Sequence, residues 1–301
     1  MIWCSSCTSC RCNEPRVNRD RLLLWCLRAC AALSGAVLLL IVAFVLREAW
    51  PALERIGWPR FFTDPSWHPA AVAARGRYDL TPMLVGTLAV VVGGVLIATP
   101  LGVLSAVFCR EYAPPRLAQA YRRIIELLAG IPSVVYGFWG LVVLVPLIRQ
   151  LHPPGPSLLA GALILALMIL PTIALLADAA LARLPVAYQR GAAVLGLSRW
   201  RWVWSVAVPA ARPGLYGAVC LATARAVGET MAVLMVCGNV VQVPDSVFDP
   251  IRALTANIAL EMAYAAGDHR AALFVSGLLL LGLIIALAVV ADRVAEAPRH
   301  A

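Results

Sequence analysis

Long apolar runs dominate the sequence and predict helices that cross a membrane. Six nearly uncharged runs approach or exceed roughly 20 residues, the length that spans a hydrocarbon layer about 30 Å thick. Their approximate limits are 22–46, 82–108, 127–148, 157–177, 214–237 and 271–291. The third run begins with Gly130 and Pro132, so we expect a bend there whose freed backbone groups are satisfied by neighbouring helices. The pattern predicts an all-α membrane protein with six transmembrane helices in one bundle.

Composition supports this assignment. Hydrophobic residues make up 61% of the 301 residues and charged residues only 14%, and the mean hydropathy is +0.83. This is more apolar surface than a soluble core of that size needs. The first run is too long for a signal-peptide core and lacks a convincing small-residue cleavage site. We therefore expect it to remain as a membrane anchor.

The residues before the first run, 1–21, form a leader rich in cysteine and arginine. Four of the nine cysteines of the chain gather here: Cys4, Cys7, Cys10 and Cys12. In a reducing cytosol this spacing is compatible with a metal site, although the spacing is irregular and a disordered leader explains it as well. We favour the disordered leader and expect no cofactor and no metal. Structural disulfides are not expected on the cytoplasmic side.

The basic residues, all 25 of them arginine, predict the orientation of the chain. Cytoplasmic segments collect positive charge, and an inward amino terminus fits this tendency best, with both termini cytoplasmic. Eight arginines then face outward, five of them in one long loop, and Arg28 and Arg225 lie inside spans. The fifteen cytoplasmic residues are Arg11, Arg16, Arg19, Arg21, Arg110, Arg116, Arg122, Arg123, Arg183, Arg190, Arg199, Arg201, Arg212, Arg293 and Arg299. The net charge of +9 thus reflects topology and contact with anionic lipid, and nucleic acid is not an expected partner.

Two segments between the spans are expected on the outward side. The first, 47–81, contains FFTDPSWHP at 61–69, and its aromatic residues are expected either to mark the membrane interface or to cap the bundle from outside. The second, 239–270, ends in a helix-like piece in which Asn257 and Glu261 share a face. We expect that face to be solvated.

The cytoplasmic segment 178–213 reads as two short helical pieces, broken near Gly196 and closed by Pro209. Helices of this length are marginal alone, so a surface is expected to hold them. One candidate surface is an apolar groove on another protein. The other is the lipid surface, which RWRWVW at 199–204 would suit. The residues themselves favour neither.

At this segment the sequence resembles the coupling loop of ABC-importer permeases, whose pattern is EAA, a short spacer, LG and a later LP. The matching positions are Arg190, Gly191 and Ala192, then Leu195 and Gly196, and finally Val208 and Pro209. The leading glutamate of the pattern is replaced by Arg190. The resemblance implies contact with a separate ATP-hydrolysing partner, without the polar contact that the glutamate would make.

Further stretches resemble one branch of these proteins, the permease subunits of phosphate importers of the PstC/PstA type, and lean toward PstC. They are 61–69, 98–114, 126–141, and ARAVGETMAV at 224–233 with CGN at 237–239. The resemblance implies a type I ABC-importer permease fold over 22–301, in a bacterial inner membrane, that forms half of a pathway for inorganic phosphate. The implied partners are a second homologous permease, a dimer of ATP-binding subunits and an outward-side phosphate-binding protein.

Arg225 and Glu229 are the charged residues near the middle of the fifth predicted span. One helical turn separates them, so both would face the same neighbour or cavity. A charge at that depth costs about 2.5 to 3.5 kcal/mol on insertion scales and normally faces protein, a partner charge or water. Two interpretations stay open, a structural ion pair or a pathway in which the guanidinium meets a passing oxyanion. Ser133 is a weaker pathway candidate, because the Pro132 kink that exposes its hydroxyl also suits plain packing.

The sequence has no GxxxxGK[ST] phosphate-binding loop, so we do not expect the chain to hydrolyse ATP unaided or to be an enzyme. A permease for another oxyanion, molybdate or sulfate, is the nearest alternative function. An ion-driven secondary transporter is a further alternative, but the internal repeats and half-helices of that class are not evident. A membrane enzyme ranks last, because no nucleophile, base and orienting group have usable spacing.

Overall fold

The computed structural model describes residues 15–70 and 76–296. The chain forms two units, residues 1–48 and residues 49–301. In the first unit, the described residues belong to helix α1 (Pro15–Arg55), whose last turns enter the second unit. Predicted features of the leader, namely Cys4, Cys7, Cys10, Cys12 and most of segment 1–21, lie outside the described residues.

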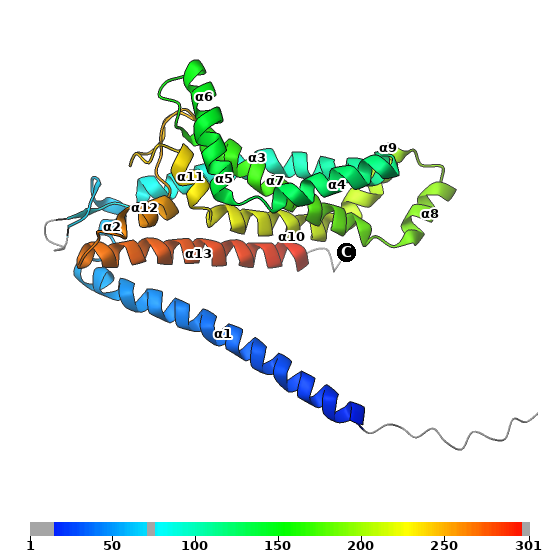
Figure 1. The fold of residues 1–301 in the computed structure, drawn as a ribbon, viewed down its shortest axis with the longest axis horizontal. Helices are drawn as coiled ribbons and strands as arrows, with labels where there is room; N and C mark the ends of the chain where they lie inside the picture. Colours follow the sequence, from blue (N-terminus) through cyan, green and yellow to red (C-terminus); the bar gives the residue numbers. More distant parts are fainter. Residues whose placement is uncertain (1–14, 71–75, 297–301) are drawn as a thin grey trace, which may run out of the picture. The chain divides into compact units, whose positions relative to one another are not determined.

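The second unit is built almost entirely of helices (Figure 1). In chain order they are α2 (Arg60–Thr63), α3 (Thr81–Val107), η2 (Phe108–Tyr112), α4 (Pro115–Ala129), α5 (Ser133–Trp139), η3 (Gly140–Leu144), α6 (Val145–Leu151), α7 (Leu158–Ala182), α8 (Val186–Val194), α9 (Arg199–Arg201), η4 (Trp202–Ala207), α10 (Val208–Val227), α11 (Met231–Val236), α12 (Leu254–Glu261) and α13 (Asp268–Glu296). Helix α3 packs along α7, α7 along α10, and α10 along α13. The all-helical membrane fold predicted from the apolar runs is confirmed.

The number of spans differs from the prediction. Five described helices are long and apolar enough to cross a membrane, Arg21–Arg55, Thr81–Tyr112, Ser133–Leu151, Leu158–Ala182 and Asp268–Val290. The predicted fifth span, 214–237, is instead divided into α10 and α11 by residues 228–230. The count of six transmembrane helices is therefore not confirmed, and the continuous helix expected at this stretch is interrupted. An apolar run indicates that a segment is buried in lipid or protein, but it does not indicate where the helix is interrupted.

Three π-helical turns lie just before prolines. The turn η3 precedes Pro146, η4 precedes Pro209, and η2 ends two residues before Pro114. Proline has no N–H to donate, and its ring clashes with the carbonyl four residues earlier, which a wider turn relieves. Helices therefore continue through Pro146 and Pro209 without a break.

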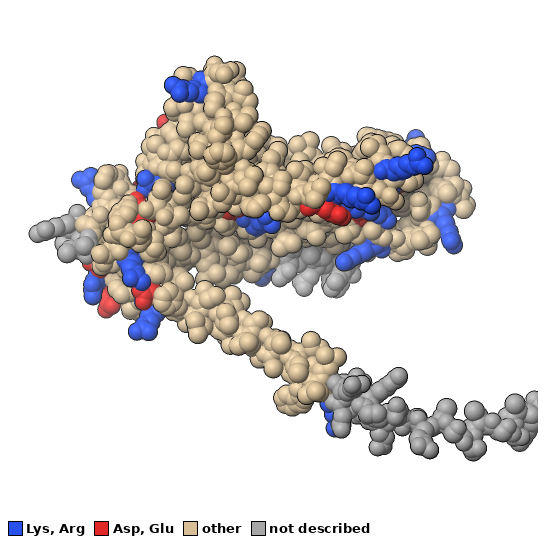
Figure 2. All heavy atoms as spheres, in the orientation of Figure 1, with Lys and Arg blue, Asp and Glu red and all other residues tan. Residues whose placement is uncertain are grey.

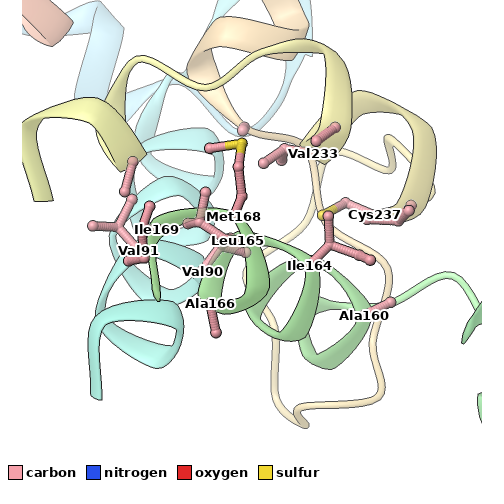
Figure 3. Close-up of a cluster of buried hydrophobic side chains, with 14 of the residues drawn as sticks. Val90, Val91, Ala160, Ile164, Leu165, Ala166, Met168, Ile169, Val233 and Cys237 are labelled. Atoms are coloured by element: carbon pink, nitrogen blue, oxygen red, sulfur yellow. The ribbon is translucent and has the colours of Figure 1, made fainter. Parts of the chain in front are cut away.

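The middle of the second unit is an apolar core between α3, α7 and α11. Figure 3 shows side chains of these elements pointing toward one another, with Val90 and Val91 on α3, Ile164, Leu165, Met168 and Ile169 on α7, and Val233 and Cys237 at α11. The helices approach closely at glycine. A Cβ added at Gly102 of α3 would lie 2.8 Å from Ile173 Cγ2 of α7, closer than real Cβ contacts. Small residues at helix interfaces allow this close packing in membranes.

Two further apolar clusters define the ends of the second unit. We call one the arginine-rich end, where Ala106, Val107, Ala177, Leu181, Ala192, Trp202, Val203, Ala207, Ala211 and Leu215 pack together. We call the other the aromatic end, where Ala49, Ala52, Ile56, Phe61, Trp67, Tyr78, Leu80, Met83, Leu254, Ala271, Ala272, Leu273 and Val275 pack together. On the visible face, basic side chains gather over α4, α8 and α9 and around α2 and α12, and most of the surface between is uncharged (Figure 2). This distribution suits a bundle with both ends in water.

The aromatic end corrects the expectation for 47–81. Strands β1 (Trp67–His68) and β2 (Arg77–Tyr78) pair antiparallel, with Trp67 opposite Tyr78, which the sequence did not predict. Phe61 and Tyr78 are fully buried and Trp67 is 5% exposed, so these rings fill the protein core rather than mark the interface. Burial raises the pKa of the Tyr78 phenol, which donates to Ala70 O and stays neutral at physiological pH.

Candidate functional site

A helix break lies at the centre of the stretch ARAVGETMAV. Helix α10 ends at Val227 with Gly228 as its cap, and α11 begins at Met231. The Glu229 carboxylate accepts a hydrogen bond from Ala232 N at 3.2 Å, so it satisfies a free N–H of the first turn of α11. From α12, Thr255 Oγ1 donates to Glu229 O at 3.0 Å. Hydrogen bonds with Ala232 of α11 and with Thr255 of α12 therefore hold the break in place.

The break separates the two charged residues that the sequence placed on one continuous helix. Arg225 is in the last turn of α10, whereas Glu229 is half-buried between the helices. Among the described residues, Arg225 and Glu229 do not form an ion pair with each other or with a third residue. The one-turn geometry assumed for the pair was wrong, because glycine and the capping carboxylate end the helix first.

Arg225 is an exposed residue of α10. Its guanidinium is within electrostatic range of the Tyr136 hydroxyl on α5, which itself donates to Leu128 O at 2.8 Å. No hydrogen-bond acceptor for Arg225 is present in the described part of the chain. The Arg225 guanidinium is permanently charged and has no acceptor here, so it can donate hydrogen bonds to a group from outside this chain.

Ser133 lies in the same neighbourhood, on α5. The bend expected at Gly130 and Pro132 is confirmed, since α4 ends at Ala129 and α5 begins at Ser133. Helix α5 packs on α11 at Gly137, where an added Cβ would lie 2.8 Å from Ala232 Cα. Ser133 is half-buried. The fold thus brings α5, with Ser133 and Tyr136, beside the helix break, while a role for the Ser133 hydroxyl stays a prediction.

The predicted coupling segment is an exposed helix and turn. Arg190 and Gly191 are exposed on α8, and Ala192 is the one buried residue of that helix, where it joins the cluster of Trp202 and Val203. Leu195 is 77% exposed at the end of α8. The break near Gly196 is confirmed, with φ at +66°, a conformation that favours glycine.

Pro209 has a different position from the one predicted. It does not close the second helical piece, because α9, η4 and α10 run on without a gap from Arg199 to Val227. Pro209 lies inside this continuous stretch, directly after η4, whose wider turn accommodates the proline ring. The coupling segment therefore consists of helix α8 and, after the turn at Gly196, of the continuous helical stretch formed by α9, η4 and the start of α10.

The structure also reveals a polar network at the aromatic end that the sequence did not predict. Glu261 accepts from Arg252 Nη1 at 2.7 Å, from Trp67 Nε1 at 3.0 Å and from His269 Nε2 at 2.9 Å. Asn257 is fully buried, and its Oδ1 accepts from Arg252 Nη1 at 3.2 Å. The predicted solvated face of Asn257 and Glu261 was wrong, since both face protein. Their spacing indicated a shared face, but the partners lie outside α12, on the loop before it, at the start of α13 and on the distant strand β1.

The described part of the chain contains no candidate metal site. Within residues 15–70 and 76–296, no three His, Cys, Asp or Glu side chains are grouped closely enough to hold an ion. The predicted site residues lie at two places, the helix break and the coupling segment.

Comparison with known proteins places the fold in a family. Residues 98–299 match the family model described as binding-protein-dependent transport system inner membrane component. The chain belongs to this family. The matched region of this inner membrane component includes the bend before α5, the coupling segment and the helix break.

Relatives of this inner membrane component cover most of its length. It is 35% identical over 279 residues to the phosphate transport system permease protein PstC of Mesorhizobium japonicum, covering 86% of this chain and 83% of that protein. It is 45% identical over 206 residues to the probable ABC transporter permease protein YqgH of Bacillus subtilis, covering 68% of this chain and 66% of that protein. Among solved structures, a bacterial alginate ABC transporter in complex with a pentasaccharide-bound periplasmic protein matches with a TM-score of 0.63 and 15% identity, over 94% of this chain and 98% of that one. At that identity the match supports the fold alone.

Proposed function

We propose that this chain is the permease subunit of an ATP-driven importer of inorganic phosphate and forms half of the transmembrane pathway. The observation that carries the proposal is Arg225, an exposed guanidinium without an acceptor in the described chain, beside a helix break. The solute comes from the relatives, because PstC proteins at 32–35% identity are named for phosphate transport.

The chemistry of Arg225 suits a passing oxyanion. Its planar fork donates two parallel hydrogen bonds to phosphate oxygens and keeps its charge at physiological pH. Exposure of such a charge to lipid costs about 2.5 to 3.5 kcal/mol on insertion scales, so the side chain faces a partner subunit or a water-filled route. The nearby Glu229 carboxylate weakens anion binding, which allows release.

The coupling segment supports an ATP-hydrolysing partner. Val194 is 87% and Leu195 77% exposed, so α8 presents apolar side chains that this chain leaves uncovered. Of the two surfaces that the sequence left open, an apolar groove on another protein fits such a helix. The family pattern has a glutamate where Arg190 stands, so the polar part of the contact differs.

The remaining parts of the proposal follow from charge and family. The arginine-rich end faces the cytoplasm together with both termini, and the aromatic end faces outward, where a phosphate-binding protein delivers the solute. A second homologous permease supplies the other half of the pathway. The protein is in a bacterial inner membrane.

Transport by the assembled complex in vesicles tests the proposal. Labelled phosphate is offered with sulfate and molybdate as competitors, and vanadate is added to block ATP hydrolysis. We expect uptake that prefers phosphate and stops with vanadate. Preference for sulfate or molybdate would reassign the solute, and uptake insensitive to vanadate would favour an ion-driven transporter.

Arg225→Gln tests the pathway itself. We expect this variant to lose uptake while the complex still assembles, because glutamine keeps the polar side chain but removes the charge and the fork. Arg212→Gln is the matched control, since Arg212 is also an exposed arginine of α10, thirteen residues away at the arginine-rich end. Normal uptake by Arg225→Gln would exclude a pathway role.

A further inference from the structure

The aromatic end of the second unit has a second group of side chains that suits anion binding. A cavity of about 630 Å³ is bordered by residues from β1, the loop before α12, the end of α12 and the start of α13. Its polar lining includes Arg252, Glu261, Tyr264, His269 and His68. The helix break and Arg225 are not part of this lining.

The Glu261 carboxylate organises the donors that border the cavity. It accepts from Arg252, Trp67 and His269, and its side chain is 9% exposed. A carboxylate with this many donors has little capacity left for a cation. Glu261 therefore holds the surrounding groups in place rather than binding a ligand itself.

Arg252 is fixed in one orientation with part of its fork unused. Its Nε donates to Asn239 O at 2.9 Å, and its Nη1 donates to Glu261 and Asn257. In the described part of the chain, no acceptor lies within hydrogen-bond distance of Nη2, although the side chain is only 19% exposed. A guanidinium held by several bonds keeps its remaining donors ready for an acceptor from outside.

Further polar groups border the same cavity or lie next to it. Tyr264 is 68% exposed and brings a hydroxyl. His269 donates through Nε2 to Glu261, which leaves Nδ1 as an acceptor without a partner among the described residues. Next to Arg252, Asn257 Nδ2 is buried without an acceptor. A buried donor without an acceptor is costly, which favours an oxygen-bearing ligand or water near this position.

We propose that this cavity is an oxyanion-binding site to which phosphate binds before it enters the membrane pathway. The proposal rests on the proposed function, which supplies both the solute and the outward orientation. The site holds phosphate through Arg252 Nη2, with the Tyr264 hydroxyl as a further donor and His269 Nδ1 as an acceptor for a protonated phosphate oxygen. Because Glu261 offsets the charge of Arg252, binding is weak enough for onward movement.

The structure connects this cavity to the helix break through α12. Glu261 ends α12 at the cavity, and Thr255 near its start bonds to Glu229 O at the break. Their separation of six positions corresponds to about 9 Å of helix. The proposed site lies at one end of α12 and Arg225 lies on α10 beside the break that α12 contacts, so either site can be removed by mutation without the other.

Phosphorus NMR of inorganic phosphate with the full chain in lipid nanodiscs tests the site. All measurements use the Arg225→Gln variant, which removes the proposed phosphate contact in the pathway. Any broadening of the phosphate signal that remains then reports on binding in the cavity. We expect saturable broadening there and a roughly tenfold weaker apparent affinity when Arg252→Lys is added, because lysine keeps the charge that pairs with Glu261 but loses the fork. Tyr264→Phe should weaken the affinity less, since it removes one exposed hydroxyl.

The outcomes separate this proposal from the proposed function. Absence of broadening on the Arg225→Gln background, or broadening that neither Arg252→Lys nor Tyr264→Phe changes, would overturn the site whatever the uptake assay shows. An importer specific for sulfate or molybdate would instead overturn the proposed function, and that anion would then replace phosphate in the titration. Trp58→Phe is the fold control, because Trp58 is exposed and does not border the cavity.

Discussion

At the aromatic end of the second unit, one carboxylate accepts from donors before and after its own helix and from a distant strand, whereas at the arginine-rich end several guanidiniums lack an acceptor. Glu261 is surrounded by Arg252, Trp67 and His269. On the other side, the described residues offer no hydrogen-bond acceptor to the side chains of Arg190, Arg199 and Arg201, which are all exposed. A carboxylate surrounded by donors of its own chain maintains the local geometry, whereas exposed apolar side chains such as those of α8 form a surface on which a partner can pack. The comparison shows that internal hydrogen bonds organise the aromatic end, whereas the side chains of the arginine-rich end are exposed.

Glu261→Gln is expected to have the largest effect of the changes that test this difference. The amide cannot accept from all three donors, and it leaves Arg252 as an uncompensated, largely buried charge. Breaking one side of a buried ion pair costs about 3 to 5 kcal/mol, so the unfolding temperature of the purified chain should fall sharply. Glu54→Gln, at an exposed glutamate of α1, is the control. Equal unfolding temperatures for the two variants would show that the network does not stabilise the aromatic end.

Gly196→Ala tests the open end. The added Cβ meets no atom within 4 Å, but φ at +66° strains a residue other than glycine, by about 1 to 2 kcal/mol. We expect a small loss of stability and a larger loss of phosphate-stimulated ATP hydrolysis by the complex, because the strain is located at the end of α8. Gly191→Ala, in the exposed part of the same helix, should stabilise it slightly. If ATP hydrolysis is unchanged in Gly196→Ala, the turn does not set the position of α8.

Thr255→Val should have the smallest effect and tests the connection between the cavity and the break. It removes the hydroxyl that donates to Glu229 O and keeps a similar shape, which costs about 0.5 to 1.5 kcal/mol. Hydrogen exchange at residues 228–232 should become faster. Thr223→Val provides the comparison, because its hydroxyl donates to Val219 O within α10. Identical exchange at the break in both variants would mean that α12 does not hold it.

Much of the fold follows from residue chemistry that is local in sequence. The runs at 82–108 and 157–177 correspond to α3 and α7, and the bend at Gly130 and the break at Gly196 lie where they were predicted. Proline and glycine restrict or free the backbone at their own positions, so a sequence reveals them directly.

The errors share a different origin. The break after Val227 was missed because an apolar run continues through it, and Pro209 was read as a stop because the π-turn before it depends on the surrounding helix. Asn257 and Glu261 were assigned to a solvated face because their partners, Arg252, Trp67 and His269, lie on other segments. None of these partners is recognisable from spacing along one helix.

By itself, the sequence determined that this protein is an all-helical membrane protein, where its main apolar helices lie and which stretches resemble phosphate permeases. These properties depend on hydrophobic length and local motifs, which each segment carries alone. Only the tertiary structure decided that Arg225 has no acceptor in the described chain, that Glu229 caps a new helix and that Glu261 gathers donors beside a cavity. Hydrogen bonding and burial are relations between distant segments, and folding is what brings those segments together.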